Sequence, residues 1–264
     1  MDYVVDQNWL GNTTTPNLSC LTKDPNNRFI IPDSGLTEMF KNSNWREITL
    51  QNLEILSKNP DKTFITMDLK EAFDFEIKNK RAIKKEELID SKFSCFVRKY
   101  MMHADQLTEL EKIISIEKTI SKTKILESES HKAKIKKMTK KIQKDCTPDE
   151  IKVIMGNDFK EKSNLIADFI RKNFTSISSE NPQLFIEPSI VSKTLYARIF
   201  ISFCFIKDGF PEKRLAKKFT NDLLDTEYAI LGSCFDQVLS EDKFVRDLYF
   251  HLRNYECSQK NQDI

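Results

Sequence analysis

The chain has 264 residues, of which 39% are hydrophobic and 31% charged, and its formal net charge is +2. This apolar content excludes a chain that is disordered throughout, and the length allows one large folded domain or two small ones. The most apolar run, residues 199–206, is far shorter than the roughly 20 residues of a membrane-spanning helix, so we predict no transmembrane segment.

The six cysteines are isolated from one another along the chain, and no two of them form a CxxC pair. The first ten residues lack the basic start and the apolar core of a secretory leader. Isolated cysteines in such a chain are typical of free thiols in a reducing compartment. We therefore predict an intracellular protein, either cytoplasmic or nuclear.

Residues 1–60 are predicted to form an irregular N-terminal arm with one or two short helices. Three of the eight prolines lie within residues 1–34, and the sequences around Pro25 and Pro32 have turn compositions. Between these turns lies the short apolar run Phe29–Ile31. It fits either an edge strand or a segment laid over the rest of the protein.

The next segment, residues 61–147, contains neither proline nor glycine, the two residues that most often interrupt regular structure. Residues 63–66 suit a brief strand, and Asp68 is placed to cap a following helix. Apolar residues then recur every three or four positions over residues 88–101, a spacing that predicts a helix with a broad buried face. We interpret residues 61–146 as one long helical domain.

After His103 the apolar pattern narrows to a seam of about two heptads. A sustained coiled coil needs about three or four heptads. The spacing therefore predicts a short contact with one partner helix, from another protein or from a second copy of the chain. The predicted interface residues are Leu107, Leu110, Ile113, Ile114 and Ile120.

The helical segment ends in a lysine-rich arm that is expected to pack little. Residues 118–144 contain ten lysines and two acidic residues, a charge of +8 that leaves −6 for the remainder of the chain. Such an arm suits the phosphates of a nucleic acid, an acidic protein or an anionic membrane surface, although a solvated helix face or a disordered linker also explains it. It contains no arginine and no aromatic residue for base stacking. The predicted polyanion-binding lysines are Lys132, Lys134, Lys136, Lys137, Lys140, Lys141 and Lys144.

Residues 147–257 are predicted to fold as a C-terminal helical bundle. Thr147 is the expected N-cap of a helix whose first residue, Pro148, needs no amide partner. Residues 189–206 carry apolar side chains almost all round, as a central buried helix does, and Gly209 is expected to end it. The predicted fold is therefore mainly α, with an irregular N-terminal arm, a long central helical or coiled segment and a C-terminal helical bundle.

A second basic cluster lies on the helix predicted to begin at Pro211. Its residues form i,i+4 pairs on the side away from the apolar positions, as on an ordinary solvated face. If this side and the lysine-rich arm face the same way, the two clusters form a groove for a polyanion. The cluster consists of Lys213, Arg214, Lys217 and Lys218.

No arrangement of side chains in the sequence indicates catalysis, a metal or a cofactor. The histidines His103, His131 and His251 are far apart, and the five glycines form no phosphate-binding loop. Four acidic residues resemble an acid–base set, but a solvated helix start and flank is the simpler interpretation. We predict no catalytic, cofactor-binding or metal-binding residues and no enzyme activity. The four acidic residues are Asp68, Glu71, Asp74 and Glu76.

The leading hypothesis is a non-enzymatic intracellular scaffold or adaptor that acts through helix-mediated association, with a partner or with itself. It predicts an oligomer in light scattering that polar residues at Leu110 and Ile113 dissociate. The alternative is a helical nucleic-acid-binding protein, of nucleoprotein or packaging type, that contacts RNA or DNA with the two basic clusters and binds with a steep salt dependence. A hydrolase or transferase with an unfamiliar site is the third hypothesis.

Overall fold

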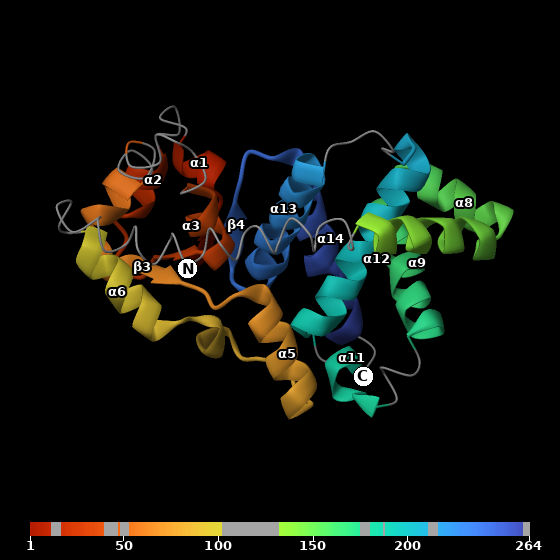
Figure 1. Ribbon diagram of the computed structural model, residues 1–264, viewed down its shortest axis with the longest axis horizontal. Helices are drawn as coiled ribbons and strands as arrows, with labels where there is room; N and C mark the ends of the chain where they lie inside the picture. The colour runs from red at the N-terminus through yellow and green to blue at the C-terminus, as the bar shows by residue number, and fades with distance from the viewer. Residues whose placement is uncertain are drawn as a thin grey trace. The chain divides into compact units, whose positions relative to one another are not determined.

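Helices make up most of the protein, and a small parallel sheet accompanies them (Figure 1). The mainly α class predicted from the sequence is confirmed. The computed structural model describes residues 1–11, 17–39, 47, 53–101, 132–174, 180–186, 188–210 and 216–260.

The chain divides into two compact units, and each unit is built from segments that are far apart in sequence. The division falls inside three helices, α5 (Leu69–Asn79), α13 (Ala216–Cys234) and α14 (Lys243–Lys260). Among the helices described, none is both long and apolar enough to cross a membrane. Unit 1 comprises Met1–Glu71, Lys84–Lys124 and Glu227–Arg246, and unit 2 comprises Ala72–Ile83, Ile125–Thr226 and Asp247–Ile264.

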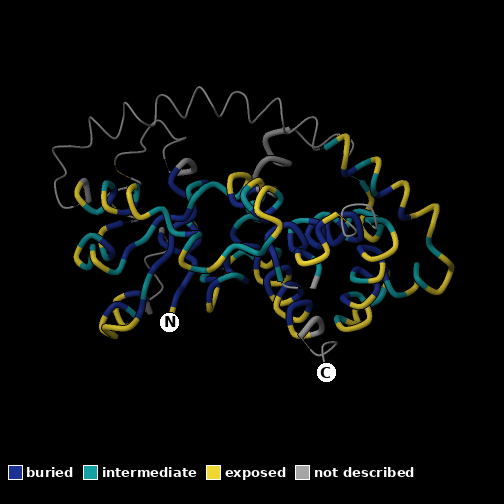
Figure 2. Tube along the Cα trace, turned by 90° about the horizontal axis from the view of Figure 1, so that it is seen from below, coloured by how far each residue is buried: buried dark blue, intermediate teal, exposed yellow. Residues whose placement is uncertain are grey.

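Unit 1 is organised around a four-stranded parallel sheet with the strand order β3-β2-β1-β4. The inner strand β1 (Asp2–Val5) pairs with β2 (Arg28–Ile31) on one side and with β4 (Gln237–Leu239) on the other. The strand β3 (Thr63–Ile65) pairs with β2 and forms one edge. Every residue of β1 is buried, as the dark blue tube beside the N label shows (Figure 2).

The segment expected to be an irregular arm therefore contains two of the four strands. Phe29, Ile30 and Ile31 are fully buried in β2, which lies inside the sheet and not at its edge. Strands of a parallel sheet are covered on both faces, so they read as short apolar runs without alternation. That pattern gives no sign of where the pairing strands lie. The expected brief strand at residues 63–66 is present as β3.

Apolar side chains from the helices of unit 1 pack with the strands in one core. Trp9, Leu18, Leu56 and Val97 belong to this core cluster. The helix α6 (Ser91–Met101) is tied to β3, because the buried Ser94 hydroxyl accepts a hydrogen bond from the Ile65 amide at 2.8 Å. Other described elements wholly within unit 1 are α1 (Gln7–Gly11), α2 (Asn17–Leu21), α3 (Asp33–Met39), a helical segment over residues 53–57, η1 (Pro60–Lys62) and η2 (Lys85–Leu88).

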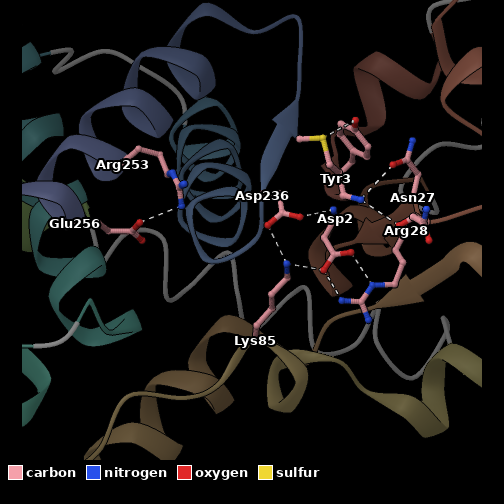
Figure 3. A network of polar contacts seen from close by, with 10 residues as sticks. Asp2, Tyr3, Asn27, Arg28, Lys85, Asp236, Arg253 and Glu256 are labelled. Atoms are coloured by element: carbon pink, nitrogen blue, oxygen red, sulfur yellow. Dashed lines mark hydrogen bonds and ion pairs between the residues drawn. The ribbon is translucent and has the colours of Figure 1, made fainter. Parts of the chain in front are cut away.

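Charged side chains close the amino-terminal edge of the sheet (Figure 3). The Asp2 carboxylate accepts a hydrogen bond from Arg28 Nε at 2.6 Å and forms an ion pair with Lys85 at 2.7 Å. Lys85 also pairs with Asp236 at 3.0 Å, just before β4. Burial alone would raise the pKa of Asp2, but the bonds and charges of Arg28 and Lys85 lower it below its ordinary value. This edge therefore consists of mutually satisfied charges.

Unit 2 contains the long helix α12 (Ile190–Asp208), most of whose residues are buried, as predicted for a central helix. Its N-cap is Ser189, whose hydroxyl accepts the Ser192 amide at 3.0 Å. Its C-cap is Gly209, as predicted, with a φ of 86° in the region that favours glycine. The other described elements lying wholly in unit 2 are a helix over residues 132–145, α8 (Pro148–Met155), α9 (Phe159–Asn173) and α11 (Gln183–Ile186).

The helix α8 begins with the cap predicted from the sequence. The Thr147 hydroxyl accepts the Glu150 amide at 3.3 Å, and the Glu150 carboxylate accepts the Thr147 amide at 2.7 Å. Pro148 occupies the first helical position. Thr147 and Pro148 are neighbours in the sequence, so the sequence alone was sufficient to predict this N-cap, and the structure adds the bond to Glu150 that completes a capping box.

Candidate functional site

The helix over residues 132–145 packs into unit 2 along one face. Ile135, Thr139 and Ile142 stand at i, i+4 and i+7, and each is only 3% exposed. The Thr139 hydroxyl donates to the Ile135 carbonyl at 2.9 Å, so its buried polar group is satisfied. For residues 132–144, the expectation that the lysine-rich arm packs little is therefore wrong, because the few apolar residues there fall on one side of a helix that unit 2 covers.

The opposite side of this helix is a face of exposed lysines, which we name the lysine face. At 100° per residue, its centre lies about 160° from the centre of the buried side, and it extends about 15 Å along the helix. Within the described residues, none of the five ammonium groups of this face forms an ion pair. Two further lysines, Lys132 and Lys136, are half-buried at the border of the face. The lysine face consists of Lys134, Lys137, Lys140, Lys141 and Lys144.

The structure does not place the other predicted binding residues. Lys213 and Arg214 lie outside the described residues, and Lys217 and Lys218 belong to α13 without described side chains. The predicted seam is likewise outside the described part of the chain, so the association hypothesis stays a prediction. The seam residues are Leu107, Leu110, Ile113, Ile114 and Ile120.

The carboxyl-terminal edge of the sheet in unit 1 holds a buried carboxylate. Asp6 follows β1 directly, is 1% exposed and accepts the Ser240 hydroxyl at 2.6 Å from the residue after β4. Burial raises the pKa of Asp6, and the negative charge of Asp242 raises it further. The hydrogen bonds from the Ser240 hydroxyl and the Asn8 amide oppose this rise. Asp6 and Asp242 are thus a pair of carboxylates at this edge, and carboxylate oxygens are ligands of hard divalent cations.

Buried hydroxyl groups also follow the other two strands at this edge. Ser34 lies just after β2 and Thr66 just after β3, and both are almost completely buried. Neither side-chain oxygen has a hydrogen-bond partner among the described residues, as is also true of Thr63 and Thr194 elsewhere. An unpaired buried hydroxyl costs about 1–3 kcal/mol. Since open parallel sheets bind ligands beyond the carboxyl ends of their strands, this edge is the second candidate site.

One of the four acidic residues interpreted as solvated is instead buried. Glu76 is completely buried in α5, and its carboxylate accepts the amides of Ile190 at 3.0 Å and Val191 at 2.8 Å. It also accepts the Ile83 amide at 2.9 Å. Burial raises the pKa of Glu76, although these bonds and the charge of Lys193 oppose the change. Glu76 is therefore a cap for the start of α12, while Asp68, Glu71 and Asp74 are more exposed.

A buried polar cluster in unit 2 joins three elements around His251 of α14. Its Nδ1 lies 3.0 Å from the Ser163 hydroxyl and 3.2 Å from the Tyr196 hydroxyl. Burial, with the positive charge of Lys162, lowers the pKa of His251 to about 3, so the ring is neutral at physiological pH. The rings of Phe159 and Phe200 lie against it, with ring centres 3.7 and 4.6 Å away. We interpret this cluster as a structural hydrogen-bond network inside the core.

The carboxyl-edge site went unrecognised in the sequence because its parts are far apart. Asp6 and Ser240 are separated by 234 positions, and the only local signal was an acidic residue directly after an apolar run. The lysine face was predicted as a charged segment, but the direction it faces depends on the packing of unit 2. Comparisons of the chain with protein-family models, with curated proteins and with solved structures find no match.

Proposed function

We propose that the protein binds nucleic acid through the lysine face. The observation that carries this proposal is the division of one helix into a buried apolar side and an exposed side of five lysines without ion-pair partners in the described chain. Fixed, uncompensated positive charges attract a polyanion, and binding releases its condensed counterions. The buried side holds the helix in place, so the lysines are presented together.

The arrangement favours nucleic acid over an anionic membrane. A helix that binds a membrane surface inserts its apolar side among the lipids, whereas this helix buries Ile135 and Ile142 inside unit 2. The lysine face is about 15 Å long, which matches about four successive phosphates of one strand. Lysine, a compact and strongly hydrated charge, suits contacts to phosphate more than base reading.

Changing the five lysines of the lysine face to glutamine should remove most of the affinity for nucleic acid. Each phosphate that a lysine neutralises contributes about 0.7 to 0.9 to the slope of log affinity against log salt, so the loss of contacts to about four phosphates should make the slope shallower by about 3 to 4. Fluorescence anisotropy with a labelled oligonucleotide at several salt concentrations measures both quantities. The five-fold Lys→Arg variant keeps the charge and should bind like the wild type. Unchanged affinity and slope in the glutamine variant would show that this face is not the binding surface.

A second candidate function is cation-assisted hydrolysis of a phosphodiester at the carboxyl edge of the sheet. Asp6 and the neighbouring Asp242 favour it, together with the hydroxyls of Ser34 and Thr66, which find no hydrogen-bond partner in the described part of the chain. The described residues contain no group of three acidic, histidine or cysteine side chains suited to a metal. Mg²⁺ often binds through only one or two carboxylates and takes its remaining ligands from water and substrate phosphates.

The chemistry at this edge is hydrolysis by water. The water oxygen bonds to phosphorus, the bond from phosphorus to the leaving sugar oxygen breaks, and one water proton passes to that oxygen. A divalent cation bound there would offset the negative charge on the phosphate oxygens. Asp6 and Asp242 would hold it through their carboxylates, and Ser34 and Thr66 would orient the phosphate through their hydroxyl groups. This candidate revives the third hypothesis drawn from the sequence.

The Asp6→Asn variant should lose divalent-dependent cleavage of nucleic acid by at least about 100-fold, because it removes the charge that holds the cation. End-labelled RNA and DNA oligonucleotides, incubated with Mg²⁺ or with EDTA and separated on a gel, report cleavage. Asp2→Asn is the matched control, since Asp2 is almost equally buried at the opposite edge of the sheet. Absence of Mg²⁺-dependent cleavage by the wild type, or equal cleavage by Asp6→Asn, would rule this function out.

Association through the predicted seam stays a prediction, and an oligomer measured by light scattering would support it. An intracellular location, cytoplasmic or nuclear, fits the six cysteines, all of which are free thiols in the structure.

A further inference from the structure

An aromatic ring lies beside the lysine helix. Phe210 follows the end of α12 and is half-buried, and the Lys136 ammonium lies 5.6 Å from its ring centre. The ring of Phe205 packs against it edge-on, with centres 5.1 Å apart and an angle of 68° between the planes. The lysine-rich segment itself contains no aromatic residue for base stacking. The fold places the ring of Phe210 beside it, although Phe210 lies more than 65 residues further along the chain.

The position of Phe210 relative to the lysine face follows from helix geometry. Lys136 lies on the border of that face, about 40° around the helix from Lys140 and one turn before it. A side chain over Lys136 is therefore next to one end of the row of exposed ammonium groups. Gly209, with its φ of 86°, makes the backbone turn that directs the chain from α12 to Phe210.

We propose that Phe210 is a stacking platform for one base of a single-stranded nucleic acid whose phosphates follow the lysine face. This inference rests on the proposed nucleic-acid binding and specifies the kind of strand. Proteins that bind single strands combine a basic track for the backbone with aromatic rings for the bases. In a duplex each base face is already covered by its neighbours, so a protein ring gains no such contact without unstacking the helix.

Binding should therefore favour single strands, and Phe210 should carry the preference. Stacking of one base changes affinity by about 5- to 150-fold when the ring is removed. The Phe210→Ala variant should lose that factor for a 15-nucleotide single strand of thymidines while keeping its affinity for a duplex of equal length. Its salt slope should stay unchanged, because no phosphate contact is removed.

Three further variants keep this test decisive. Phe210→Leu keeps an apolar side chain against Phe205 without an aromatic ring, and it should show the same loss as alanine. Phe210→Trp keeps the ring and should bind single strands at least as well as the wild type. Phe250→Ala removes the side chain of a 55% exposed phenylalanine on α14 and should bind like the wild type. Fluorescence anisotropy measures all of these affinities, and circular dichroism confirms folding.

The outcomes separate this inference from the proposed function. A wild-type protein that binds no oligonucleotide would overturn both. Binding that depends on the lysine face but is equal for single strands and duplexes, or that is unaffected by Phe210→Leu, would overturn only the stacking role of Phe210.

Discussion

Replacing Glu256 with glutamine should lower the free energy of unfolding by about 3–5 kcal/mol. Glu256 lies on α14 and pairs with Lys193 of α12 at 2.5 Å, and the side chains are 9% and 2% exposed. Removing the carboxylate charge leaves the buried Lys193 ammonium without this counter-charge, at a place where water cannot solvate it. Urea unfolding followed by circular dichroism measures the loss, and hydrogen exchange of the α12 amides shows whether it arises in unit 2.

The control for this variant is an exposed ion pair in the same unit. Asp168 and Arg171 pair at 2.9 Å on α9, with both side chains more than 60% exposed, so Asp168→Asn should cost no more than about 1 kcal/mol. The double variant Lys193→Met, Glu256→Leu replaces the pair with apolar groups and should regain most of the stability. A loss below about 1 kcal/mol for Glu256→Gln would show that this pair does not stabilise the buried lysine.

The second large effect is expected at Glu76. At the start of α12, the amides of Ile190 and Val191 donate to Glu76, and that of Ser192 donates to the Ser189 hydroxyl. Helix amides in the first turn have no partner within the helix, so they depend on such acceptors. Glu76→Ala leaves buried amides without an acceptor, at about 1–3 kcal/mol for each, and should lower the free energy of unfolding by about 3–5 kcal/mol.

The measurement combines urea unfolding with hydrogen exchange at Ile190 and Val191, whose protection should fall most. Glu150→Ala is the control, because Glu150 caps α8 in an exposed position, where the loss should be about 1 kcal/mol. A Glu76→Ala protein as stable as the Glu150→Ala protein would contradict the capping role. Since Glu76 and Glu256 both interact with Lys193, their effects should not add.

The pKa of Glu76 also predicts how pH affects stability. Burial raises this pKa above its ordinary value of 4.5, so the folded protein holds the proton more tightly than the unfolded chain does. The carboxyl therefore favours the folded state below pH 4.5, and this contribution is lost as the pH rises through the raised value. In Glu76→Gln, this part of the pH dependence should be absent.

Local signals predicted the start of α8 at Thr147 and the end of α12 at Gly209. The N-cap at Thr147 and the stop at Gly209 involve neighbouring residues, and α12 is apolar almost all round, so each could be recognised without tertiary information. The strands were harder because each has only three or four residues. A run of that length fits a strand, a loop or a buried helix segment equally.

The candidate sites depend on partners that sequence spacing cannot show. Glu76 looked solvated because two of its three amide partners, at the start of α12, lie 114 and 115 positions later. Asp6 has the sequence context of a helix cap, and only the sheet brings Ser240 to it. The composition of the sequence predicted a lysine-rich segment. The direction in which its lysines face is set by the burial of Ile135, Thr139 and Ile142 on the other side of the helix.

The pairing of β1 with β4 also affects how the protein folds during synthesis. More than 230 residues lie between these two strands, and a ribosome adds about 5–20 residues per second. For roughly 10–50 s, the nascent chain therefore holds β1 with one edge open. An open strand edge is prone to pair with other chains, so unit 1 is expected to be the part of the nascent protein that chaperones protect longest.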